Sequence, residues 1–197
     1  MADDVTFYFD PTCPFTWRTS RWIREVTEPR GHTIGWRLMS LMILNEGREL
    51  PEAYRDAVAY SIRPVRVLHA ALERHGSAAL DRLYTEFGTR VHDKGDELSD
   101  ATLAAAIEAA GLPSDLLGAA NDDGLDPAIR KTHDEGQARV GQESGSPITA
   151  IGDGPGFFGP VVVPVPDGEA AEKLYDAVRL LAAVPEFSEL KRARAAF

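Results

Sequence analysis

The sequence predicts an α/β fold in which a four-stranded mixed sheet is interrupted by a long helical segment. Two observations lead to this fold class. Apolar residues alternate with a period of two near the start of the chain and return to β-like patterns after residue 145. The stretch between them, from about residue 51, is alanine-rich and shows helical patterns only. A helical stretch of this length exceeds any ordinary loop, so we expect an inserted subdomain.

The first elements carry clear local signals. Val5, Phe7 and Phe9 share one face of an alternating run, which predicts a strand that ends at Pro11. A right-handed parallel crossover is expected, because a helix and a second alternating run follow. These elements are a strand over residues 4–10, a helix from residue 13 to 29–31, and a strand over 32–41.

Helical spacing dominates the middle of the chain. Pro64 interrupts the first pattern, so separate or kinked helices are expected on its two sides. Leu80, Leu83 and Phe87 belong to the best amphipathic pattern in the chain. The predicted helices cover residues 52–62, 65–75, 77–91, 99–111 and 126–140, with a short one from Ser114.

The last part returns to β-structure and then to helices. Strands are expected at 148–151 and at 157–158, a helix from residue 167, and a short helix around 187–192. We therefore predict a discontinuous α/β domain from residues 1–45 and 145–197, with residues 46–144 as the helical insertion.

Composition excludes several functional classes. The 197 residues carry a formal charge of −10, which argues against nucleic acid and anionic membranes as partners. No apolar run approaches the ~20 residues of a membrane span, and the start does not resemble a signal peptide, so a cytoplasmic protein is expected. A single cysteine rules out an internal disulfide and cysteine-ligated metal sites, and the five histidines lack ligand spacing. We expect no metal.

That single cysteine, Cys13, is the strongest chemical signal. A lone cysteine is usually a small buried hydrophobe. Here it lies just after a strand and at the start of a helix, with Pro14 at a favoured first-turn position. Backbone N–H groups and the helix dipole stabilise a thiolate there, so we expect a pKa below the ordinary ~8.5. Thr16 lies one turn further along the same face, where its hydroxyl can donate to the sulfur.

Two separated motifs carry a family resemblance. Cys13-Pro14-Phe15-Thr16 follows an alternating strand, and Gly145-Ser146-Pro147-Ile148 comes far downstream. Together they resemble the thioredoxin fold in its DsbA-like form with a helical insertion, and especially the actinobacterial mycothiol-dependent nitroreductases. The resemblance extends over nearly the whole chain, including the stretches Thr19-Ser20-Arg21-Trp22-Ile23, Arg63-Pro64-Val65-Arg66-Val67 and Phe157-Phe158-Gly159-Pro160.

The resemblance implies roles for individual residues. Cys13 matches the nucleophilic cysteine, and Ser146-Pro147 matches the cis-proline loop that packs against it, although on residues alone Pro147 is an ordinary strand-edge proline. Residues that would shape the site or contact substrate or thiol are Pro14, Phe15, Trp17, Asn45, Tyr54 and His92.

One departure from the family pattern changes the expected chemistry. Thr16 stands where a second cysteine is typical, so a two-cysteine exchange cycle cannot run. We expect a thiol-dependent oxidoreductase with Cys13 as nucleophile, Thr16 as its helper, and mycothiol or glutathione as co-substrate beside a disulfide or electrophile.

Two alternatives stay open. Kappa-class glutathione transferases and 2-hydroxychromene-2-carboxylate isomerases share this fold, but they place a serine where Cys13 stands. The other alternative is a non-catalytic protein that binds a thiol-containing ligand. A homodimer is also left open.

Overall fold

The computed structural model describes residues 3–141 and 144–193. The strands are β1 (Val5–Phe9), β2 (Ile34–Leu38), β3 (Ile148–Ile151) and β4 (Gly156–Phe158). The α-helices are α1 (Pro14–Thr27), α2 (Leu41–Leu44), α3 (Glu52–His75), α4 (Ser77–Gly88), α5 (Asp100–Ala109), α6 (Asp126–Val140) and α7 (Gly168–Ala182). Shorter turns of helix are 3₁₀ segments at Glu28–Arg30, Ser114–Asn121 and Asp123–Leu125, and a π-helical turn at Thr89–Asp93.

The four strands form one mixed sheet in the order β2-β1-β3-β4. β1 pairs in parallel with β2, whereas β3 is antiparallel to both β1 and β4. The predicted α/β fold with a mixed four-stranded sheet is therefore confirmed. The carboxyl ends of β1 and β2 and the start of β3 meet at one edge of the sheet, because Phe9 pairs with Leu38 and Tyr8 pairs with Ile148.

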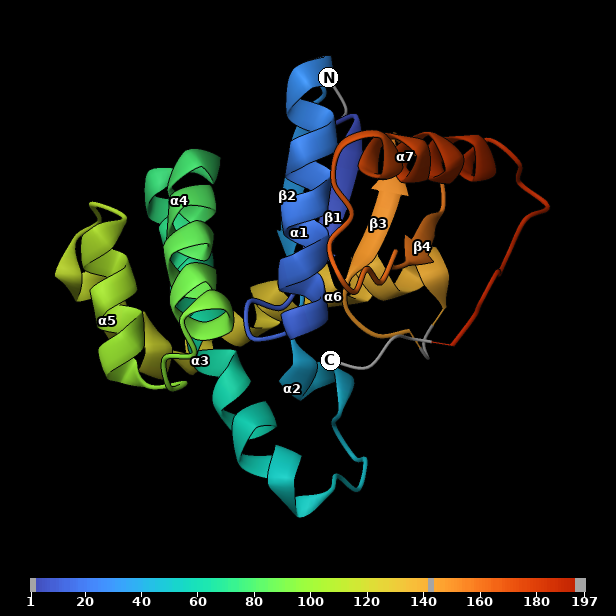
Figure 1. Ribbon diagram of the computed structural model, residues 1–197. Helices are drawn as coiled ribbons and strands as arrows, with labels where there is room; N and C mark the ends of the chain where they lie inside the picture. Colours follow the sequence, from blue (N-terminus) through green and yellow to red (C-terminus); the bar gives the residue numbers. More distant parts are fainter. Residues whose placement is uncertain (1–2, 142–143, 194–197) are drawn as a thin grey trace.

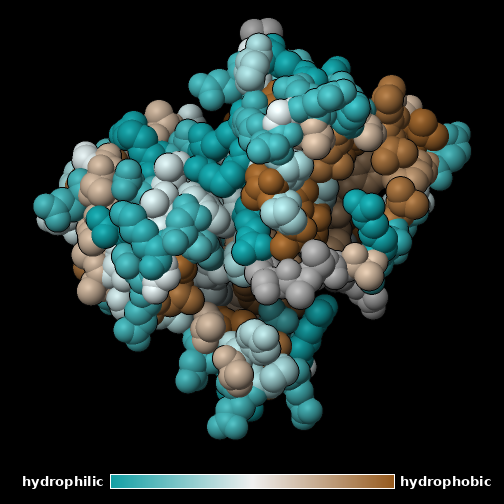
Figure 2. Space-filling model, viewed as in Figure 1, coloured by the Kyte–Doolittle hydropathy of each residue, from teal (hydrophilic) through white to brown (hydrophobic). Residues whose placement is uncertain are grey.

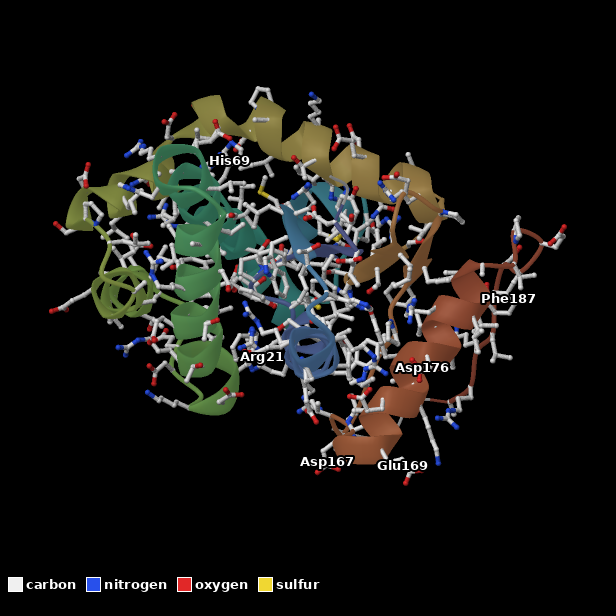
Figure 3. The ribbon with its side chains drawn as sticks, turned by 90° about the horizontal axis from the view of Figure 1, so that it is seen from above. Arg21, His69, Asp167, Glu169, Asp176 and Phe187 are labelled. Atoms are coloured by element: carbon white, nitrogen blue, oxygen red, sulfur yellow. The ribbon has the colours of Figure 1, made fainter. Side chains whose placement is uncertain are left out.

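Helices cover both faces of the sheet. Seen from above, α1 and α7 lie on one side and α6 on the other (Figure 3). Phe7 and Phe9 are fully buried on the α1 side, in the same core cluster as Trp22 of α1. This is the face that the alternation of β1 predicts, since every second side chain of a strand points the same way.

The opposite face of β1 explains a glycine in the middle of α6. Tyr8 packs there with Met39 and Ile148, and its ring lies against Gly136. A Cβ atom on Gly136 would lie 2.8 Å from Tyr8 Cδ1, closer than such contacts occur. The missing side chain thus lets α6 approach the sheet closely.

The remaining helices between β2 and β3 stand beside the sheet (Figure 1). α4 connects them to the sheet: the Tyr84 ring lies tilted against Phe9 at 4.2 Å between ring centroids and meets Trp17 edge-on at 5.5 Å. α6, by contrast, packs directly against the sheet. The division into a domain of residues 1–45 and 145–197 and an insertion of 46–144 stays a prediction.

Two expectations for the helices are wrong: separate helices on the two sides of Pro64, and a short helix around residues 187–192. A kink at Pro64 stays a prediction. Pro64 lies inside α3, which continues through it as one helix. Ile62 and Val65, on either side of it, are buried in the same core cluster, so tertiary packing outweighs the backbone hydrogen bond that proline cannot make. Residues 187–192 form no helix; Leu190 there is 84% exposed, and a helix this short is unstable without a surface to pack on.

The surface in the view of Figure 2 is mostly polar, with brown residues in several places. Brown residues gather at the end of α7 and just beyond it, where Leu180 and Val184 are exposed. Across the described ranges, each helix is too short or too polar to cross a bilayer.

Candidate active site

Cys13 is the N-cap residue of α1, at the sheet edge where β1 and β2 end. Its backbone is extended (φ −80°, ψ 117°), and Pro14 begins the helix. The Cys13 N–H donates to Asp10 O at 3.1 Å and closes a turn between β1 and α1. Pro14 is exposed and Phe15 is half-buried, whereas the Cys13 side chain itself retains only 6% exposure.

The loop before β3 lies directly against this cysteine. The Ser146–Pro147 peptide bond is cis, as the resemblance implied. Cys13 Sγ lies 3.7 Å from Ser146 O, in the geometry of an S–H donor to a carbonyl acceptor. Residues that are 133 positions apart in the chain therefore form one site.

A hydroxyl pair lies beneath the sulfur. Thr16 is fully buried, and its Oγ1 is 2.6 Å from Ser146 Oγ, a pair in which either oxygen can donate. Ser146 Oγ already accepts the Asp10 N–H at 3.3 Å. When Ser146 donates to Thr16, the Thr16 proton is left for the Cys13 sulfur.

The expected low pKa of Cys13 is wrong. Burial raises the pKa of Cys13, and the negative charge of Asp10 adds to this increase. Hydrogen bonds from the Thr16 side chain and from the backbone of Thr16 and Phe15 lower the pKa, as expected for a helix start, but burial is the larger effect. Cys13 is therefore a thiol at neutral pH, and its S–H can donate to Ser146 O.

Trp17 and His92 pack together next to the turn that carries Cys13. Trp17 is 2% exposed, donates from Nε1 to Asp93 Oδ1 at 2.8 Å, and stacks with His92 at 5.8 Å. His92 Nε2 lies 2.9 Å from Pro11 O and must be the donor, because a carbonyl only accepts. Burial lowers the pKa of His92, so its ring is neutral at pH 7. Arg21 lies over the Trp17 ring at 3.9 Å, between α1 and α4 (Figure 3).

The structure does not bring the other two residues of the predicted site into contact with Cys13, Thr16 or Ser146 by any hydrogen bond of the described residues. Asn45 is half-buried at the end of α2 and donates from Nδ2 to Leu41 O at 2.8 Å. Tyr54 is 64% exposed on the first turn of α3.

Sequence reasoning missed Asp10. This carboxyl group is fully buried beside the cysteine turn and accepts three hydrogen bonds. The signal for it was an acidic residue directly after an apolar strand and directly before Pro11 and Thr12, since Asp commonly binds backbone N–H groups two residues on. Where the structure describes the chain, it holds no cluster of three histidine, cysteine or acidic residues suited to a metal.

Comparison with known proteins identifies the family. The model of the family described as mycothiol-dependent nitroreductase Rv2466c matches residues 12–192. The chain belongs to this Rv2466c-like family. A Mycobacterium tuberculosis protein named only as uncharacterized protein Rv2286c is 35% identical over 195 residues, covering 95% of this chain and 81% of that protein.

Solved structures show the same fold at lower identity. A 2-hydroxychromene-2-carboxylate isomerase aligns with a TM-score of 0.61 and 15% identity, covering 91% of this chain and 94% of that one. DsbA of Chlamydia trachomatis aligns with a TM-score of 0.53 and 14% identity, covering 91% and 88%. The Rv2466c-like chain thus has the DsbA-like thioredoxin fold that its motifs indicated, in a family of thiol-dependent oxidoreductases.

Proposed function

We propose that the protein is a thiol-dependent oxidoreductase that works through one nucleophilic cysteine. The contact between Cys13 Sγ and the cis Ser146–Pro147 loop carries this proposal. It brings the only thiol of the chain to a helix start and to the backbone of the loop before β3, at the edge of the sheet. Thr16 supplies a hydrogen bond to the sulfur but cannot form a disulfide with it.

The reaction that fits one thiol is disulfide exchange in two steps. Cys13 first loses its proton, and Thr16 with the backbone N–H groups of α1 stabilises the thiolate. The Cys13 sulfur then bonds to one sulfur of a substrate disulfide, while the other sulfur leaves with the bonding electron pair and takes up a proton. Cys13 is released as a thiolate when a small thiol forms a new disulfide with the bound sulfur. The substrate thiol is set free and the small thiol is oxidised, so electrons balance without another reductant.

Mycothiol is the small thiol we assign to this reaction, with glutathione as the competing choice. The family description, which names mycothiol, supports this choice. Exposed Pro14 and half-buried Phe15 directly follow Cys13 in the chain and are the residues we assign to contact with the thiol. Asn45, Tyr54 and His92 stay candidates for substrate contact. Since low-molecular-weight thiols are kept reduced inside cells, we propose a cytoplasmic location.

Intact-mass spectrometry tests this function directly, because each adduct can lie only on Cys13. Protein is incubated with the disulfides of mycothiol, glutathione or bacillithiol, and then with the matching thiol. The expected result is a single adduct that the thiol removes, with mycothiol fastest and with no reaction in Cys13→Ser. Multiple turnover that persists in Cys13→Ser would overturn covalent catalysis.

A second function is favoured by the burial of Cys13. A protonated Cys13 that donates to Ser146 O resembles a hydroxyl donor more than a nucleophile. In that scheme Cys13 and Thr16 donate hydrogen bonds to the thiolate of a bound thiol, which itself attacks an electrophile. Cys13→Ser would then retain transfer of the thiol to an electrophile, whereas the first function requires its loss.

A further inference from the structure

Asp10 lies at the point where three segments of the site meet. It follows β1 directly, is fully buried, and shares a turn with Cys13 through the 3.1 Å hydrogen bond from Cys13 N–H to Asp10 O. Its own N–H donates to Ser146 Oγ at 3.3 Å. The backbone of Asp10 therefore touches both the cysteine turn and the cis-proline loop.

The carboxyl group connects the same turn to α2. Oδ1 accepts two hydrogen bonds from Thr12, from its N–H at 2.8 Å and from its hydroxyl at 2.6 Å. Oδ2 accepts the N–H of Leu41, the first residue of α2, at 2.7 Å. All three partners donate, so they match a carboxylate, which only accepts.

We propose that Asp10 is a positioning residue whose carboxylate fixes the Cys13 turn against α2 and whose charge controls the reactivity of the Cys13 thiol. The inference deepens the proposed function, since it names a control of the same sulfur. It rests on that function only in taking Cys13 as the reacting group.

The charge of Asp10 makes the Cys13 thiol harder to deprotonate. Burial raises the pKa of Asp10 from 3.8 to about 6, against the three hydrogen bonds that lower it. Once ionised, Asp10 opposes a second negative charge on Cys13 and raises the pKa of that thiol. The two groups therefore titrate as a coupled pair, and Cys13 is easier to deprotonate while Asp10 is still protonated.

Two histidines reach the same turns from other elements. His92 of the π-helical turn donates to Pro11 O, and His133 of α6 accepts the Ser40 N–H through Nδ1 at 3.3 Å. Burial lowers the pKa of both rings. Because they also titrate in acid, the test must separate their protonation from that of Asp10.

The experiment measures the rate at which N-ethylmaleimide modifies Cys13, by intact mass, between about pH 5 and about pH 8.5. For an isolated thiol the rate rises in proportion to the hydroxide concentration. In the wild type we expect the rise to flatten around pH 6, where Asp10 ionises, and to resume above it. Asp10→Asn should remove the flattening and react about tenfold faster at pH 8.

Thr12→Val is the matched variant that keeps the charge. It removes one donor to the carboxylate, so the flattening should persist and move to higher pH. Two further controls keep the contacts without the titration: His92→Gln retains a donor for Pro11 O, and His133→Asn retains an acceptor for Ser40. Both should keep the flattening, and its loss in either one would assign the effect to that histidine and overturn the proposal.

A strictly proportional profile in the wild type, or a flattening that survives in Asp10→Asn, would also overturn it. Near-UV circular dichroism checks that each variant is folded. If Asp10→Asn does not fold, the test compares the wild type with Thr12→Val. Identical dependences of the alkylation rate on pH in these two proteins would refute the proposal. Alkylation requires no turnover, so this outcome is independent of whether Cys13→Ser abolishes exchange.

Discussion

The buried Asp10 predicts an unusual dependence of stability on pH. Its pKa is raised from 3.8 to about 6 in the folded state, so the folded protein binds more protons than the unfolded chain between these values. Stability from this group is therefore present at low pH and lost as pH rises through the window. At 1.36 kcal/mol for each pKa unit the full effect is about 3 kcal/mol, of which about 2 kcal/mol falls between pH 4 and pH 7.

The measured quantity is the difference in the free energy of unfolding between the wild type and Asp10→Asn. Urea unfolding followed by tryptophan fluorescence gives the free energy of unfolding of the wild type and of Asp10→Asn at each pH. The wild type should lose about 2 kcal/mol relative to the variant from pH 4 to pH 7. Asp4→Asn is the control of opposite sign. Hydrogen bonds from Thr33 lower the pKa of Asp4, so its contribution is present at neutral pH and is lost in acid. A wild-type minus Asp10→Asn difference that is flat, or that grows with pH, would refute a buried Asp10 with a raised pKa.

Two further substitutions follow from the packing of the site and of the sheet. Thr16→Val removes the hydroxyl beneath the sulfur and nearly keeps the shape of the side chain. Alkylation of Cys13 at pH 8, measured by intact mass, should therefore slow about tenfold. An unchanged rate would exclude a hydrogen bond from Thr16 to the thiolate. Gly136→Ala should destabilise the protein by about 1–3 kcal/mol, because the new Cβ would meet Tyr8 at 2.8 Å. Gly118→Ala, which meets nothing within 4 Å, should be neutral or slightly stabilising in the same urea titrations, and equal effects at the two glycines would contradict the packing argument.

Local pattern carried the prediction of the elements around the site. Alternation placed Phe7 and Phe9 on the buried face of β1, and Pro14 marked the start of α1. These signals depend on neighbours in the chain, which the sequence contains. The meeting of Cys13 with the Ser146–Pro147 loop followed from the family resemblance, since no local pattern links positions so far apart.

The errors arise where distant packing outweighs a local rule. Pro64 reads as a break, yet its helix is held on both sides by the core. The helix dipole correctly predicts a favourable field at Cys13, but the sequence does not show what lies over the sulfur. Burial of the sulfur and the charge of Asp10 reverse the expected direction of the Cys13 pKa. For Asp10, the two hydrogen bonds from Thr12 had a local signal that was overlooked, whereas the bond from Leu41 comes from a distant segment and had none.

A raised thiol pKa and an oxidoreductase role are compatible if proton loss is coupled to substrate entry. The Cys13 S–H is directed at Ser146 O, in the loop against which a bound disulfide would lie. A substrate that displaces this contact removes the acceptor of the proton, and the Thr16 hydroxyl and helix amides remain as donors that favour the thiolate over the thiol. Buried in this way, Cys13 is protected from indiscriminate oxidation in a protein without a second cysteine to resolve the product. Selectivity would then come from access to the sulfur. The charge on Asp10 would set the free energy that substrate binding has to supply to deprotonate Cys13.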